Sequence, residues 1–186
     1  GQYCVVSWAH NRELGTRAYT RDFTTPHAAS AARQPYVKLH EQSEHSDLAL
    51  NKQGEDVYVA IDYQADRGDV FMVNLKTGKR TSLFPTYLSG TATAIHFSGK
   101  AYGKPGWALV STYGEYHASN QASSLRNTAM QQWMHRKIFA VSLEENPQIR
   151  PLAHADSDSK SSWGSDAYWA EPQATVNSDF TRVLFN

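Results

Sequence analysis

The chain of 186 residues carries 18 basic and 18 acidic residues, so its formal net charge is zero, and 40% of its residues are hydrophobic. This balance argues against binding to nucleic acid or to an anionic membrane surface, because both depend on an excess of lysine and arginine. No apolar run approaches the roughly 20 residues of a membrane-spanning helix, so we expect a globular, strand-rich protein without a membrane span.

The first forty residues predict three strands. Apolar or β-branched runs occupy residues 3–8, 16–20 and 36–39. The segment 24–35 between the last two is rich in alanine, serine, threonine and proline, which indicates an extended loop. Residues 45–84 contain a complete pattern of four strands. By comparison with it, we interpret these three runs as the second, third and fourth strands of a repeat, 1–40, that lacks its first strand.

Residues 45–84 contain the complete pattern. Four short runs, each β-branched or aromatic, are separated by gaps that hold glycine, aspartate, asparagine or lysine, which is typical of a tight antiparallel meander. The runs are 47–51, 56–62, 69–75 and 79–84. One such sheet cannot bury both of its faces, so we expect it to pack against copies of itself.

A third repeat occupies residues 93–152. Its strands are expected at 93–97, 106–112, 138–143 and 148–152. An insertion, 113–136, separates the second strand from the third. Apolar residues at helical spacing within 124–135 predict a short helix in this insertion.

The fourth repeat, 172–186, contains two expected strands, 172–177 and 181–185. Leu50 to Val57 aligns with Val176 to Val183 without a gap, which indicates a repeated unit. Because the chain begins in an apolar run and ends inside an expected strand, we interpret it as part of a longer chain. The repeats favour an all-β fold, a β-propeller with about three and a half four-stranded blades, and an ordinary β-sandwich with unrelated hairpins is the alternative.

Three segments resemble the repeats of TolB-like, WD-type β-propellers. They are Leu48–Val59, Asp69–Lys79 and Ala174–Phe185. In that family a Ser-x-Asp-Gly turn joins the inner strand to the next, and Asn177–Val183 is similar to it but has Phe180 where glycine is usual. The resemblance implies a single partial propeller domain over 1–186, within a ring of about seven blades. The remaining blades would come from the same chain or from another one.

A narrower resemblance is to bacterial polysaccharide lyases built on propellers, the ulvan and oligogalacturonate lyases, which use histidine, tyrosine and arginine in a cleft. It implies a secreted or periplasmic bacterial protein that acts on an acidic polysaccharide or oligosaccharide and cleaves uronic-acid glycans by β-elimination. The cofactor stays open, with zinc and calcium as the divalent metals to consider. The Gln-x-x-His-x-His metal pattern of the oligogalacturonate enzymes is absent, since Val176 and Ser178 follow Gln173 at the two histidine positions. That departure argues against a pectate-type enzyme.

Two other classes of function remain open. A non-catalytic TolB-like propeller would bind protein partners through its rim and channel. A peptidase-associated propeller would have its catalytic serine on a separate domain. The broader resemblance does not choose between them, because a propeller specifies a fold and not a reaction.

Residues just before the first strand of a blade are expected at the mouth of the channel, where ligands usually bind. His45 lies five residues before Leu50, and Glu171 lies five before Val176, so the alignment gives them equivalent places on two blades. A histidine and a carboxylate on one rim suit acid–base chemistry or metal binding. The alternative is that both cap turns and face water.

A second candidate group follows the second strand of the third repeat. β-Elimination needs a base for the C5 proton, an acid for the leaving oxygen and a cation for the enolate-like charge. The expected catalytic residues are His45, Tyr113, Tyr116, His117 and an arginine, Arg126 or Arg136. The alternative for the tyrosines is an aromatic cluster that anchors the inserted loop.

Flat aromatic rings on loops suit stacking on sugar faces. The candidates for substrate binding are Trp133, Trp163, Tyr168, Trp169 and, from the rim, Glu171. The same rings would equally suit an interface with missing blades or with another subunit.

Two residues are candidate metal ligands. His96 lies in an expected channel-lining strand, and Cys4 is the single cysteine, so no internal disulfide can form and its thiolate is available to bind zinc with histidines. No Cys-x-x-Cys or His-x-x-x-His spacing accompanies them. The alternatives are a half-buried histidine bonded to backbone and a small buried thiol.

Overall fold

The computed structural model describes residues 2–9, 11–117, 120–124, 131–155 and 171–186, and of residues 114–117 and 120–124 the backbone alone. These residues form an all-β structure with no helix among them, and so with none that could cross a bilayer. The strands are β1 (Tyr3–Ser7), β2 (Thr16–Thr20), β3 (Tyr36–His40), β4 (Ser46–Leu50), β5 (Asp56–Asp62), β6 (Asp69–Asn74), β7 (Arg80–Pro85), β8 (Thr91–Ser98), β9 (Trp107–His117), β10 (Asn120–Ser124), β11 (Lys137–Ser142), β12 (Ile149–His154), β13 (Thr175–Val176) and β14 (Val183–Leu184).

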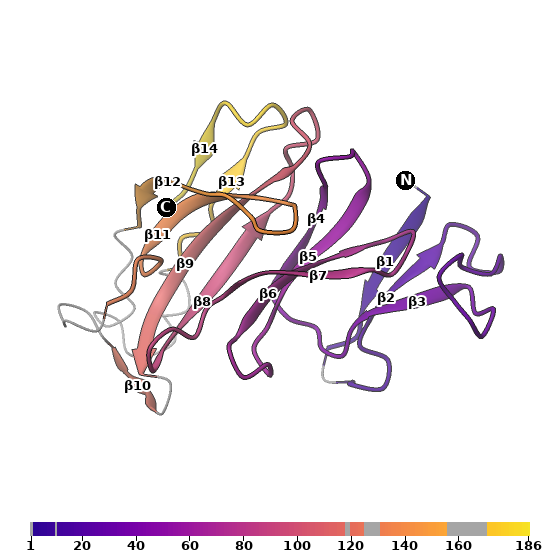
Figure 1. The fold of residues 1–186 in the computed structure, drawn as a ribbon, viewed down its shortest axis with the longest axis horizontal. Coiled ribbons are helices and arrows are strands. Elements are labelled where there is room, and N and C mark those ends of the chain that lie inside the picture. The colour runs from indigo at the N-terminus through magenta and orange to yellow at the C-terminus, as the bar shows by residue number, and fades with distance from the viewer. Residues whose placement is uncertain (1, 10, 118–119, 125–130, 156–170) are drawn as a thin grey trace.

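The strands pair into four antiparallel sheets, and within each sheet they largely follow chain order (Figure 1). The sheets are β1-β2-β3, β4-β5-β6-β7, β8-β9-β11-β12 and β13-β14. β10 is an addition, because it pairs with the far end of β9 and forms a hairpin outside the meander. The predicted meander is confirmed in the second repeat, where each strand lies within a residue or so of its expected bounds.

Both faces of the β4–β7 sheet are buried, because its strands alternate apolar side chains toward two different cores. Val57, Val59 and Ile61 of β5 belong to a core shared with the β8–β12 sheet, which contributes Val110 and Phe139. The intervening residues face the other way, into a core shared with the first sheet. That second core contains Tyr58 and Ala60 of β5, Phe71 and Val73 of β6, and Ala18 and Leu39 of the first sheet.

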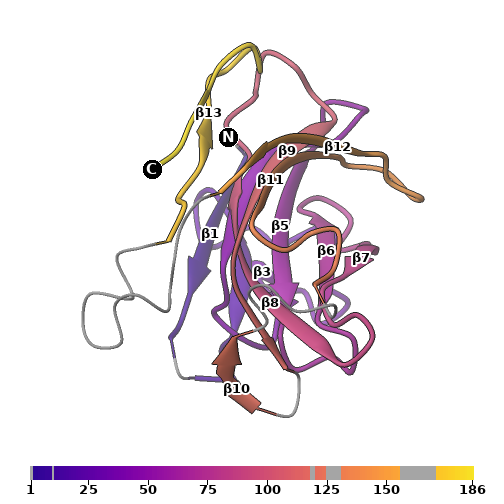
Figure 2. The same ribbon diagram turned by 90° about the vertical axis from the view of Figure 1, so that its left-hand side faces the viewer.

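A third core lies between the β8–β12 sheet and the β13–β14 pair, with Leu109 and Ile138 on one side and Val176 on the other. The four sheets therefore pack face to face in a row that follows chain order, and they overlap when seen along that row (Figure 2). This arrangement confirms that one sheet packs against the next. It differs from a two-layered sandwich and is consistent with propeller blades, although the described residues do not close into a ring.

The insertion of the third repeat begins as strand rather than as loop. β9 continues to His117, and its end pairs with β10. Of the predicted helix, residues 125–130 lie outside the described part of the chain, and residues 131–136 include a turn but no helix.

The turns after β4 and β13 support the alignment of the second and fourth repeats. Asn51 Oδ1 accepts the backbone N–H of Glu55, and Asn177 Oδ1 accepts that of Thr181. Phe180 has a φ of 58°, as Gly54 at the aligned position has 76°. The next strand then begins one residue later in the fourth repeat, because Leu50 pairs with Asp56 whereas Val176 pairs with Val183. The ungapped alignment is thus correct for the turn and slips by one residue in the strand.

Candidate functional site

The candidate site lies where the first strands of three successive sheets, β4, β8 and β13, meet. β8 contacts both β4 and β13. His45 directly precedes β4, His96 lies in β8, and Glu171 lies four residues before β13. Residues of three different sheets can therefore approach one another where β4, β8 and β13 meet, and we call this place the seam.

A chain of hydrogen bonds joins these three side chains. His45 Nδ1 lies 2.8 Å from His96 Nδ1, and His96 Nε2 lies 2.7 Å from Glu171 Oε2. Beyond His45, the hydroxyl of Tyr113 lies 3.5 Å from Nε2. The Tyr113 ring also stacks on His96, with ring centroids 4.8 Å apart. The structure thus gathers two predicted catalytic residues, a predicted metal ligand and a predicted substrate-binding residue into one cluster.

The cluster is largely buried. The side chains of His96 and Glu171 are 18% and 10% exposed. Burial is the main cause that lowers the pKa of His45 to about 4. Desolvation disfavours the charged imidazolium, so His45 is neutral at neutral pH and carries a lone pair that can accept a proton.

With Glu171 ionised and both imidazoles neutral, the two hydrogen bonds allow one consistent placement of the protons. An ionised Glu171 can only accept, so His96 donates from Nε2. When both rings are neutral, His96 has no proton left on Nδ1 and accepts the Nδ1–H of His45. Nε2 of His45 is then an acceptor, and it faces the Tyr113 hydroxyl. At 3.5 Å this last contact is long for a hydrogen bond.

A pocket of about 420 Å³ opens beside His45 and Tyr113, and we call it the tyrosine pocket. Tyr63 and Tyr87, in the turns after β5 and β7, also line it. Tyr63 accepts the N–H of Ile95 on its hydroxyl, and its carbonyl accepts the hydroxyl of Tyr87. Burial raises the pKa of both phenols, so they stay neutral and can donate hydrogen bonds.

Sequence reasoning missed Tyr63, Tyr87 and the neighbouring Gln64, which also lines the tyrosine pocket. A signal for them existed. In an antiparallel meander, the turn between the second and third strands lies at the same end of the sheet as the start of the first strand. The turn after β5 is therefore beside His45 by topology alone.

A second pocket, of about 310 Å³, is lined by the other member of the histidine pair, His96. It is also lined by Asp47 and Lys100, by Gln173 shortly before β13, and by Thr175, the first residue of β13. We call it the Lys100 pocket. It runs beside β4, β8 and β13 and so extends the site along the first strands of three sheets.

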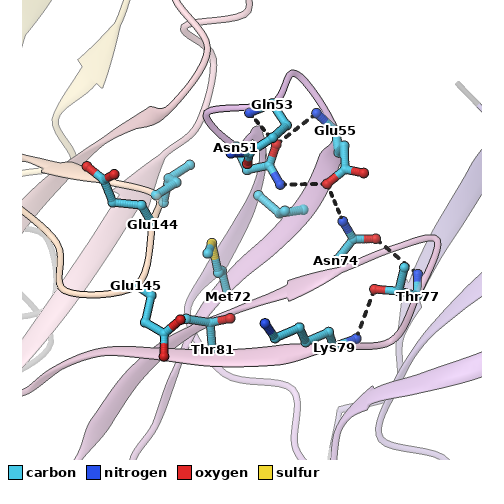
Figure 3. A pocket seen from close by; sticks show the side chains of 12 residues that line it. Asn51, Gln53, Glu55, Met72, Asn74, Thr77, Lys79, Thr81, Glu144 and Glu145 are labelled. Carbon is cyan, nitrogen blue, oxygen red and sulfur yellow. Dashed lines mark hydrogen bonds between the residues drawn. The ribbon is translucent and has the colours of Figure 1, made fainter.

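A third hollow, of about 370 Å³, lies at the opposite end of the β4–β7 sheet (Figure 3). Its polar groups bind one another: the amides of Asn51 and Asn74 both donate to Glu55 Oε2, at 2.9 and 2.8 Å. These bonds tie the turn after β4 to β6. The hollow contains no histidine among its described residues, so we place the candidate chemistry at the seam instead.

The remaining described candidates lie apart from the cluster. Trp133 is 46% exposed and packs on Phe139, with ring centroids 5.4 Å apart, and it lines neither pocket at the seam. Cys4 is exposed in β1, in a different sheet from His96. The two metal candidates are therefore not brought together, and the described parts of the chain contain no group of three or more potential ligands placed to hold a metal.

Other predicted site residues cannot be placed. Tyr116 and His117 lie in β9, of which the structure describes only the backbone at these positions. Outside the described residues are Arg126, Trp163, Tyr168 and Trp169.

Comparison with known proteins gives no relative: no family model, no curated protein and no solved structure matches the chain.

Proposed function

We propose that the chain is part of a secreted or periplasmic bacterial β-propeller that acts on an acidic polysaccharide and cleaves uronic-acid glycans by β-elimination. The observation that supports this is the hydrogen-bonded chain Glu171–His96–His45 that ends at Tyr113 beside the tyrosine pocket. It supplies a neutral base and a neutral acid a few ångströms apart, which is what an elimination needs.

In this mechanism Nε2 of His45 takes the C5 proton of a bound uronate. The electrons of that C–H bond form the C4–C5 double bond, and the bond from C4 to the glycosidic oxygen breaks. The Tyr113 hydroxyl gives its proton to the leaving oxygen. The tyrosinate then regains a proton from His45, because the two atoms lie 3.5 Å apart, and both groups return to their starting state.

Glu171 and His96 act through His45. Glu171 holds His96 in the tautomer that accepts from His45, and this leaves Nε2 of His45 free as a base. The hydroxyl of Tyr63, a neutral donor that lines the tyrosine pocket, would bind the substrate carboxylate as charge develops next to it.

The test is to incubate the protein with a panel of uronate glycans and to follow the ultraviolet absorbance of the conjugated double bond in the product. We expect His45→Gln and Tyr113→Phe each to lower the rate by about 10²-fold or more. His154→Gln and Tyr102→Phe are matched controls, since both residues are exposed and line neither pocket at the seam. No absorbance rise with any uronate glycan would refute the proposal.

A non-catalytic propeller that binds protein partners is the second candidate. Leu184 in β14 is 73% exposed, and Phe185, directly after this strand, is 41% exposed, so the edge of the last described sheet presents apolar side chains that a protein partner would cover. Specific recovery of one protein in a pull-down without glycan, lost in Leu184→Asp, would favour this function.

A further inference from the structure

Each of the two pockets at the seam is lined by one member of the histidine pair. His45 lines the tyrosine pocket and His96 lines the Lys100 pocket, and their Nδ1 atoms are 2.8 Å apart. A ligand that extended from one pocket into the other would therefore pass the proposed acid–base group.

The backbone beside the Lys100 pocket is held firmly. Asp47 Oδ2 accepts the N–H of Gly99 at 2.9 Å. A Cβ at position 99 would lie 2.1 Å from the carbonyl oxygen of Leu48, so only glycine lets the turn after β8 pack directly on β4. Lys100 follows immediately, which fixes its Cα at the edge of the pocket.

Charge distinguishes the two pockets. Of the described residues that line them, Lys100 is the only lysine or arginine. Its side chain is exposed, and none of the ion pairs among the described residues engages it. Asp47 is the carboxylate in the same pocket, and its two oxygens accept the backbone N–H groups of Leu48 and Gly99.

We propose that the Lys100 pocket is a second sugar subsite, in which Lys100 binds the carboxylate of a uronate adjacent to the one in the tyrosine pocket. This inference rests on the proposed function and deepens it. The ligand is a polyanionic glycan of at least two consecutive acidic sugars, and the bond that is cleaved lies at the boundary between the pockets. Lys100 is a specificity residue, because it contacts the substrate without taking part in the proton transfers.

The test measures binding by calorimetry in the His45→Gln background, where the ligand is not consumed. The probes are an oligouronate of four sugars and the same oligomer with its carboxylates reduced to alcohols. We expect Lys100→Gln to weaken binding of the oligouronate about fivefold and to reduce its salt dependence, as for one exposed ion pair. Binding of the reduced oligomer should not change. Lys104→Gln, in the same exposed loop, is the matched control and should have no effect.

The possible outcomes separate the subsite from the lyase. Equal affinities of the Lys100→Gln variant and its parent for the oligouronate would overturn the subsite, whether or not the wild type forms an unsaturated product. An equal loss in Lys104→Gln would also overturn it, because the effect would then be one of overall charge. Lys100-dependent binding with no unsaturated product from the wild type would uphold the acidic-sugar subsite and overturn the lyase.

Discussion

His45 and His96 face each other through the same ring atom, Nδ1, at 2.8 Å, although 51 positions separate them in the chain. A hydrogen bond between these two atoms needs a proton on one of them and a lone pair on the other, so protonation of both nitrogens would break it. The other nitrogen of His96 is bound to Glu171. Protonation of these histidines is therefore coupled to the hydrogen bond between them, so a change in pH should affect both.

Stability should fall as the pH is lowered from about 6.5 toward 4. Burial lowers the pKa of both His45 and His135 from 6.5 to about 4. In this window the unfolded chain binds protons that the folded chain does not, so the free energy of unfolding decreases by at most about 1.4 kcal/mol per pH unit for each histidine. Below pH 4 the contribution of these histidines levels off.

Denaturant unfolding across this pH range measures the effect. His45→Gln should reduce the slope of the free energy of unfolding against pH, whereas exposed His154→Gln should not. An unchanged slope in His45→Gln would contradict the assignment.

Glu171→Gln should lower kcat for the elimination about 10²-fold while leaving KM nearly unchanged. The amide keeps the size of the side chain but removes the charge that holds the His96 tautomer, so the base is misoriented and the substrate pockets are intact. Steady-state kinetics on a uronate glycan give the two parameters. Glu145→Gln is the control, because Glu145 lines the hollow at the opposite end of the β4–β7 sheet. A rise in KM with kcat preserved would mean that Glu171 binds substrate instead.

Gly54→Ala should destabilise the protein by about 1 kcal/mol, the cost of placing an L-residue in the left-handed region. Gly54 has a φ of 76°, and an added Cβ would meet nothing within 4 Å, so backbone strain is the only new term. Gly54→Asn should cost less, because asparagine tolerates this conformation better than alanine. Equal stabilities of the alanine variant and the wild type in urea titrations would show that the turn relaxes.

Phe71→Ala should cost about 3–5 kcal/mol, the value for a large buried aromatic residue. Phe71 is fully buried between the first two sheets, with the His40 ring stacked 5.1 Å away and the Arg80 guanidinium 3.6 Å from its ring centre. Phe71→Leu keeps most of the volume and should cost about 1.5 kcal/mol or less, so it remains measurable if the alanine variant does not fold. Chemical denaturation gives both values, and exposed Tyr102→Ala should change stability by less than about 0.5 kcal/mol.

The strands of the second repeat could be predicted because their signals are local. Short runs of β-branched or aromatic residues define each strand, and residues such as Gly54 and Asn74 define the turns. Phe180 also belongs to this class: the sequence marked it as a departure from glycine, and it adopts the left-handed backbone that a glycine there would adopt.

The contact between His45 and His96 could not be predicted in the same way. The alignment related His45 to Glu171, but no local pattern says which residue of β8 will lie between them. That depends on how neighbouring sheets are staggered, which is set by packing of residues such as Ile95 and Val57 in the core between them. The β9–β10 hairpin was missed because the expected strand was ended at Thr112, whereas pairing with β8 continues to His117.

Because the sheets pack in a row, the candidate site also links neighbouring sheets to one another. Each sheet is supported chiefly by its immediate neighbours, so the weak points of the molecule are the joints between sheets rather than the sheets themselves. His45, His96 and Glu171 fasten two of those joints at once. An oligosaccharide bound across both interfaces would contact neighbouring sheets at once. Its binding free energy would then stabilise the molecule against separation of those sheets.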